Sequence, residues 1–268
     1  MAAKYLAHFG LKSSPFTKEI SDDELWLPPS KQEVLADLVE ALRERTSVLL
    51  TGEPGVGKTC VLRALRRKLP QGTFRLTYCH NATLGRRDFY RQLCLALGLS
   101  PSATAAALFF GVSSHVEDLG RERIHPVFLL DEAQLLHQDT LDHLHILLNY
   151  EWDSKALLSL VLVGLPELAD RMTLRRNRCL YSRIQYRLTI DPIVPDDTAD
   201  YIAYRLKGSG CKREVFTSDA IAMIHETALG SLRDIDRVAT AALRASARRK
   251  RKLVERDVVD HVINILGV

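Results

Sequence analysis

The sequence has few cysteines, a weak net charge and no long apolar run, and each shortage excludes a class of protein. Its five cysteines form no C-x-x-C pair and have no histidine at zinc-finger spacing, so neither a disulfide framework nor a structural zinc site is expected. No apolar run reaches membrane-spanning length, and the N-terminus lacks the charged and then apolar order of a secretion signal. We therefore expect a cytoplasmic protein with free thiols and no membrane partner.

The composition is that of a folded protein. Hydrophobic residues make up 46% of the 268-residue chain and charged residues 26%, which allows a proper core and argues against a disordered regulator. The length suits one large domain, or a core with a small partner domain. A net charge of +4 is a weak signal, but the basic residues are unevenly spread.

A glycine-rich stretch, VLLTGEPGVGKTC at residues 48–60, carries the strongest chemical signal. It predicts a short apolar strand, a glycine loop and a helix that begins at Lys58 and Thr59, which is the G-x-x-x-x-G-K-T pattern in its usual setting. Glycines let backbone N–H groups face phosphate oxygens, Lys58 neutralises phosphate charge, and the Thr59 hydroxyl can ligate Mg²⁺. The predicted ATP-binding residues are Gly52, Glu53, Pro54, Gly55, Val56, Gly57, Lys58, Thr59 and Cys60.

A second stretch places two acids after an apolar run, at Asp131 and Glu132. This pattern is typical of a buried parallel strand that carries acids at its C-terminal edge, where ligands bind in open α/β sheets. Asp131 is predicted to hold Mg²⁺ through water, and Glu132 to orient or activate the attacking water. A strand followed by a solvated acid pair is the alternative. With the glycine loop upstream, the prediction is an ATPase whose metal ligands are Thr59 and Asp131.

Strands and helices alternate along the first 190 residues. Further strands are expected at residues 73–79, 157–164 and 186–190, and helices near residue 31, at 88–98 and within 100–123. The alternation predicts an α/β fold with a five-stranded parallel sheet flanked by helices. We expect a docking arm at residues 1–29, a nucleotide-binding core at 30–190, and an all-helical lid at 191–268.

Together these motifs resemble the AAA+ ATPases, and within them the branch shared by ExeA-type secretion ATPases and TnsC, TniB and MuB-type transposition ATPases. The resemblance covers nearly the whole chain, through YLAHFGLKSSPF, LPPSKQEVLADLVEAL, TGEPGVGKT, LLDEAQLL and LVLVGLPEL. The loop and acid motifs are common to all P-loop ATPases, whereas Y-x-x-x-F-G-L-x-x-x-P-F and D-E-A-Q with G-x-P-E-L are more particular to this branch. The resemblance is strongest to a TnsC-type regulator of transposition.

The resemblance implies roles that spacing alone does not assign. Arg233 matches the lid arginine that reaches the γ-phosphate. Arg183 matches the arginine finger that completes the site of a neighbouring subunit. Close rivals of Arg183 are Arg175, Arg176 and Arg178.

Leu165 departs from the pattern of this branch, which usually has a polar side chain in G-Q-P-E-L. A leucine cannot hydrogen-bond a water or a phosphate. Either another residue therefore serves as the first sensor, or hydrolysis is slow, which would suit a timer or switch better than a motor.

Basic residues concentrate before the fifth strand and at the end of the lid. The groups are Arg171, Arg175, Arg176, Arg178, Arg183 and Arg187, and Arg244, Arg248, Arg249, Lys250, Arg251, Lys252 and Arg256. Roughly six to ten phosphate contacts change affinity about 10³- to 10⁵-fold between low and moderate salt, which suffices for duplex binding without sequence readout. A solvated charged face is the alternative. The predicted DNA contacts are Arg86, Arg87, Arg248, Arg249 and Lys250.

The leading hypothesis is an ATP-dependent oligomer, a ring or a helical filament of about six subunits per turn, that binds double-stranded DNA without sequence specificity. In the nucleoid of a bacterial or mobile-element host cell, it would mark target DNA and recruit or activate a transposase. One alternative is an ExeA-like secretion ATPase, although such proteins continue into membrane and periplasmic parts that we do not find before Val268. Others are a replication-initiator or clamp-loader-like ATPase, and a small-molecule kinase for which we find no acceptor pocket.

Overall fold

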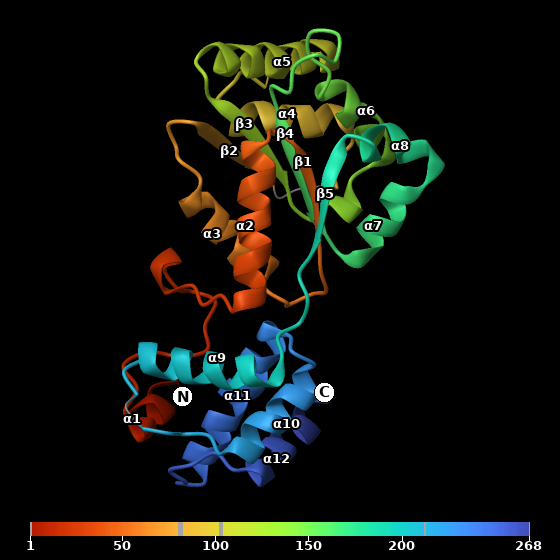
Figure 1. The fold of residues 1–268 in the computed structure, drawn as a ribbon. Helices are drawn as coiled ribbons and strands as arrows, with labels where there is room; N and C mark the ends of the chain where they lie inside the picture. The colour runs from red at the N-terminus through yellow and green to blue at the C-terminus, as the bar shows by residue number, and fades with distance from the viewer. Residues whose placement is uncertain (1, 80–82, 102–103, 212, 268) are drawn as a thin grey trace. The chain divides into compact units, whose positions relative to one another are not determined.

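The computed structural model describes residues 2–79, 83–101, 104–211 and 213–267. The chain divides into two compact units, shown as a ribbon in Figure 1. The sheet unit comprises residues Ser30–Glu53 and Val61–Ile190, and the helical unit comprises Met1–Pro29, Pro54–Cys60 and Asp191–Val268. Residues 102–103 of the helix expected within 100–123 lie outside the described part of the chain.

The sheet unit is built on five parallel strands in the order β2-β3-β4-β1-β5. The strands are β1 Ser47–Thr51, β2 Phe74–Cys79, β3 His125–Leu130, β4 Ser159–Gly164 and β5 Ile184–Thr189. The central strands β1, β3 and β4 are buried along their whole length, whereas the edge strands β2 and β5 are partly exposed. Burial on both faces explains the continuous apolar runs of the central strands. The predicted α/β fold is confirmed.

Helices flank this sheet. They are α2 Pro29–Arg43, α3 Lys58–Lys68, α4 Arg86–Ala96, α5 Ala105–Arg121, α6 Gln138–Leu147, α7 Pro166–Thr173 and α8 Arg178–Tyr181, with short 3₁₀ turns η2 Ala133–Leu135 and η3 Arg175–Asn177. The apolar faces of α4 to α8 meet the sheet in a core that includes Leu49, Phe128 and Leu162, all at most 2% exposed. Helix α2 begins at Pro29, because the fixed φ of proline suits the first position of a helix.

The helical unit contains α1 Ala2–Phe9, the turn η1 Asp22–Glu24, α9 Pro195–Gly208, α10 Ser218–Ala228, α11 Leu232–Arg248 and α12 Arg256–Leu266. Tyr5, Phe9 and Phe16 of the N-terminal segment are buried in the same core as the lid helices. Arg205 on α9 is buried and donates through Nε to the carbonyl of Pro15 at 2.7 Å. The segment is therefore fixed by aromatic packing and by a buried guanidinium. No helix in the described residues has the length and apolar character needed to cross a bilayer.

Candidate nucleotide-binding and hydrolysis site

The glycine loop leads from β1 into α3, and it has no room for a side chain at Gly55. Gly55 and Gly57 have φ of 83° and 104°, a region that L-residues rarely adopt. A Cβ at Gly55 would lie 2.3 Å from Ser231 Oγ and 3.0 Å from the Cβ of Arg233. The backbone N–H of Arg233 also donates to the Gly55 carbonyl at 3.4 Å. Within the helical unit, the structure thus brings the loop together with the predicted lid arginine.

The loop and the start of α3 fit a chain of phosphates. Lys58 and Thr59 are the first two residues of α3, and the first turn of this helix carries no acid. The positive end of the helix dipole, in a first turn whose own sequence contains no acidic residue, favours an anion at this position. The donors at this end, namely backbone N–H groups, an ammonium and a hydroxyl, suit phosphate oxygens. These residues therefore have the chemistry to hold the triphosphate of ATP.

Asp131 and Glu132 follow directly after β3, at the carboxyl edge of the sheet. Asp131 accepts two hydrogen bonds, from the Tyr78 hydroxyl at 2.7 Å and from the Glu132 backbone N–H at 2.9 Å. Partial burial and the bond to Asp131 raise the pKa of Tyr78 well above its usual range, so the hydroxyl remains a donor at neutral pH. Glu132 has left-handed backbone angles, φ 52° and ψ 37°, which cost roughly 1–3 kcal/mol in a residue with a side chain.

Gln134 is a residue of this site that the sequence did not assign. Its Nε2 donates to Glu132 Oε2 at 2.7 Å, and its Oε1 accepts from the Leu165 backbone N–H at 3.3 Å. Arg171, counted only as part of a basic cluster, donates through Nη1 to the Gln134 carbonyl at 2.8 Å. The D-E-A-Q motif pointed to Gln134, but its partner at the end of β4 follows only from the pairing of β3 with β4.

The arginines before β5 lie in different settings. Arg183, the predicted finger, donates to Asp153 Oδ2 at 2.7 Å and keeps 26% of its side chain exposed. Arg176 pairs with Asp142 at 3.1 Å, whereas Arg187 lies over the Tyr181 ring at 4.0 Å. The remaining rivals, Arg175 and Arg178, are exposed. Two of the finger candidates, Arg183 and Arg176, are thus held in ion pairs within their own protomer, and the Arg183 pair is the shorter.

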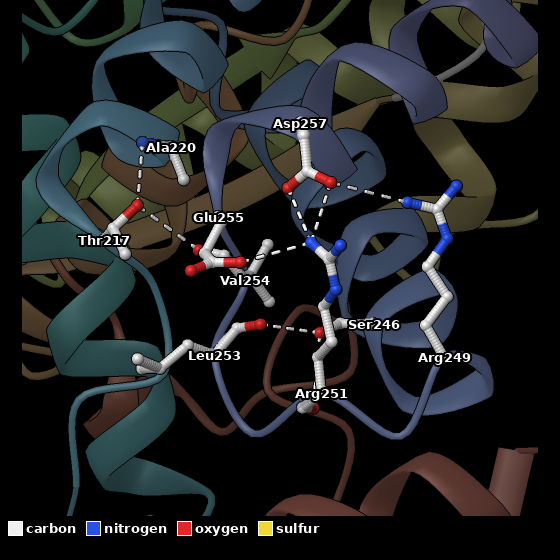
Figure 2. Close-up of polar contacts among 9 residues, drawn as sticks. All are labelled: Thr217, Ala220, Ser246, Arg249, Arg251, Leu253, Val254, Glu255 and Asp257. Atoms are coloured by element: carbon white, nitrogen blue, oxygen red, sulfur yellow. Dashed lines mark hydrogen bonds and ion pairs between the residues drawn. The ribbon is translucent and has the colours of Figure 1, made fainter.

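The basic cluster at the end of the lid is partly neutralised by acids in the same segment. Arg251 Nη1 lies 2.7 Å from both carboxylate oxygens of Asp257 and 3.2 Å from Glu255, as Figure 2 shows. Arg249 lies 3.9 Å from the same Asp257. The hydrogen bond from Arg251 is the main reason that the pKa of Asp257 is below its usual range. Two cations of this cluster, of which Arg249 is a predicted DNA contact, therefore face the carboxylate of Asp257.

The other predicted DNA contacts are exposed cations. Arg248 and Lys250 lie in and just after the last turn of α11, and Arg86 and Arg87 begin α4. None of the four has an acidic partner among the residues that the structure describes. Their charge is available to a phosphate backbone. The two pairs belong to different units of the chain.

A buried carboxyl in the helical unit also escaped the sequence analysis. Asp236 on α11 accepts a hydrogen bond from the Tyr201 hydroxyl on α9 at 2.7 Å, and Arg205 donates to the same hydroxyl at 3.2 Å. Burial raises the pKa of Asp236 from its ordinary 3.8 to about 6. The folded protein therefore binds this proton more tightly than the unfolded chain does. Linkage then makes the free energy of unfolding fall as pH rises from about 4 to about 6.

Asp236→Asn is expected to stabilise the protein at neutral pH. The amide keeps an oxygen that accepts from Tyr201, but it does not ionise, so it avoids the cost of a buried charge. We expect a gain of about 1–3 kcal/mol above pH 7, shrinking toward zero near pH 4. Urea denaturation of the parent and the variant at several pH values measures this difference. Equal stabilities at pH 7.5 would contradict the assigned burial effect.

Comparison with known proteins gives the class. The model of the AAA domain family matches residues 39–172, which include the glycine loop, the acid pair and Leu165. The chain therefore belongs to the AAA domain family. General secretion pathway protein A of Aeromonas hydrophila is 33% identical over 98% of this chain and 49% of its own length. The chain spans about half the length of this curated relative.

Solved structures show the same fold. A crystal structure of Cdc6p from Pyrobaculum aerophilum matches 94% of this chain and 70% of its own, with a TM-score of 0.68 at 21% identity. A structure of Drosophila ORC bound to DNA matches 99% of this chain and 66% of its own, with a TM-score of 0.71 at 19% identity. The family match and the 33% identical relative indicate an AAA+ ATPase of the P-loop NTPase type, and the solved structures show its fold.

Proposed function

We propose that this AAA+ ATPase is an ATP-dependent switch that assembles on double-stranded DNA without reading its sequence and, in its ATP form, marks that DNA for a transposase. The observation that carries the DNA part is the set of exposed cations without acidic partners among the described residues, at Arg86, Arg87, Arg248 and Lys250. The transposase is the partner implied by the resemblance of the motifs to TnsC-type regulators.

The nucleotide would be held by the loop from Gly52 to Cys60, with Lys58 on its phosphates. Thr59 and Asp131 would hold Mg²⁺, which supplies charge neutralisation at the phosphates when it is bound. Glu132 orients and polarises the attacking water. The position of Glu132 supports this role. Glu132 lies at the carboxyl end of β3, beside the Asp131 carboxylate, and α/β sheets bind their ligands at that edge.

Assembly is coupled to nucleotide through two arginines. Arg233 reports the nucleotide to the lid, because its backbone already contacts Gly55 of the loop. Arg183 exchanges Asp153 for the phosphates of a neighbouring subunit. A triphosphate carries more negative charge than a carboxylate, so it can compete with Asp153 for this partly exposed guanidinium. Bound ATP therefore favours contact between subunits.

DNA binding rests on phosphate contacts alone. Exposed arginines and lysines at the ends of helices reach a backbone phosphate but have no fixed geometry toward base edges. The binding is therefore strongly salt-dependent and tolerant of sequence. In the proposed role in transposition, the transposase recognises the ATP-bound assembly on the duplex.

Charge reversal tests the DNA part. Arg248→Glu with Lys250→Glu, and separately Arg86→Glu with Arg87→Glu, are each expected to weaken binding to a random-sequence duplex by at least about 10-fold and to reduce the salt slope by about 2. Fluorescence anisotropy with a slowly hydrolysed ATP analogue measures both quantities. Arg251→Gln is the matched control, because Asp257 and Glu255 already neutralise Arg251. Unchanged affinity in both double variants would remove DNA from the proposal.

A secretion-type role is the second candidate function, favoured by the 33% identity to general secretion pathway protein A over 98% of this chain. Electron microscopy with a random-sequence duplex, with and without the ATP analogue, separates the two. Rings or filaments on DNA that require nucleotide support the transposition role. Nucleotide binding without DNA association, even at low salt, would favour the secretion-type role.

A further inference from the structure

Gln134 lies between the acid pair and the end of β4. It is in the 3₁₀ turn η2 that follows β3, and its side-chain amide joins the Glu132 carboxylate to the Leu165 backbone N–H. The orientation of the amide is fixed by chemistry, because a carboxylate only accepts and a backbone N–H only donates. The Gln134 nitrogen must therefore face Glu132, and its oxygen must face Leu165.

Three further features define the surroundings of this amide. Gly164, at the end of β4, leaves the necessary space, since a Cβ there would lie 2.5 Å from Gln134 Oε1. Gly164 also accepts a hydrogen bond from the backbone N–H of Gly52, so the same residue contacts the first glycine of the loop. On the other side, Arg171 Nη1 donates to the backbone carbonyl of Gln134 at 2.8 Å. The side-chain amide therefore lies between the ends of two strands, and the arginine holds the backbone that carries it.

The leucine at position 165 supplies only its backbone to this arrangement. Its side chain has no polar atom, so the hydrogen-bonding capacity at the end of β4 comes from its N–H, and Gln134 extends it to Glu132 by one amide. The Gln134 side chain thereby fixes the direction of the Glu132 carboxylate. The backbone of Glu132 is itself in the left-handed region. Loss of the amide frees the carboxylate to rotate.

We propose that Gln134 is a positioning residue for hydrolysis, which aims the Glu132 carboxylate at the attacking water and takes the place of the polar side chain absent at Leu165. This inference rests on the proposed role of Glu132. It explains how a chain with leucine at this point retains a polar link between β3 and β4. It also predicts that Gln134 affects turnover and leaves nucleotide affinity unchanged, because its hydrogen bonds are to Glu132, Leu165 and Arg171.

The test compares two glutamines of the same segment. Gln134→Leu replaces the amide with an apolar side chain that is one bond shorter and lacks both polar atoms, and we expect kcat to fall about 10- to 100-fold, the scale for a misplaced catalytic group, with KM and ATP-dependent assembly unchanged. Gln138→Leu is the matched control. Gln138 bonds to Asp142 and Asn177, makes no contact with Glu132 and reaches Gln134 only through their shared partner Arg171, so kcat should fall much less than in Gln134→Leu.

Two results would overturn the inference. One is normal kcat in Gln134→Leu. The other is an equal loss of kcat in both variants together with a lower melting temperature and weaker ATP binding, since that pattern denotes a structural role. Glu132→Gln is measured in parallel: normal turnover there would place the failure in the proposed function, whereas blocked turnover with a normal Gln134→Leu would place it in this inference alone.

Discussion

Glu132→Gln is expected to bind ATP as the parent does and to hydrolyse it at least about 100-fold more slowly, the scale on which a positioned general base contributes. Glutamine has the same size as glutamate but does not accept a proton from water at neutral pH. Nucleotide affinity should persist because the loop and Lys58 are untouched. Phosphate release at saturating ATP and titration with a fluorescent ATP analogue measure the two effects separately.

The same variant should accumulate any assembled form. If ATP holds subunits together and hydrolysis releases them, a protein that binds but does not cleave ATP remains assembled, and electron microscopy with ordinary ATP should show what the parent shows only with a slowly hydrolysed analogue. Asp139→Asn is a suitable control, because it makes the same carboxyl-to-amide change at an exposed position of the next helix. Normal turnover in Glu132→Gln would remove Glu132 from its role.

Much of the sheet unit could be predicted because its signals are local. The glycine loop combines strand, turn and helix within 13 residues, and the buried strands stand out as apolar runs that end within two residues of the observed limits. The predicted and observed bounds differ for the edge strand β5. The fifth strand begins at Ile184, two residues before the predicted start, because Ile184 pairs with Ser47 of β1, and that register is not encoded locally.

The rest of the site depends on contacts between distant segments. Arg183 contacts Asp153 because Glu151, Trp152 and Asp153 all have positive φ and form a turn. The residue types in this loop do not predict such a turn. Tyr201 and Asp236 meet through the packing of two lid helices. The neutralisation of the lid cations could in part be predicted from the sequence, since Glu255 and Asp257 lie within six residues of Arg251.

Lys58→Ala should abolish ATP-dependent assembly. An ammonium on phosphate oxygens is a charge-assisted contact worth about 1.5–3 kcal/mol, so ATP affinity should fall roughly 10- to 100-fold or more. Helix α3 should still form, because alanine is the strongest helix former. Titration with a fluorescent ATP analogue and sedimentation with and without ATP measure affinity and assembly.

Lys68→Ala controls for the loss of a positive charge on the same helix. Lys68 is exposed at the last turn of α3, far along the helix from the loop, and its removal should cost no more than about 0.3–1 kcal/mol of dipole interaction. Loss of assembly in Lys58→Ala with normal assembly in Lys68→Ala would locate the control of assembly at the phosphates. Unchanged assembly in Lys58→Ala would contradict every role proposed here that depends on nucleotide, from the exchange of Arg183 between Asp153 and a neighbour to the marking of DNA in the ATP form.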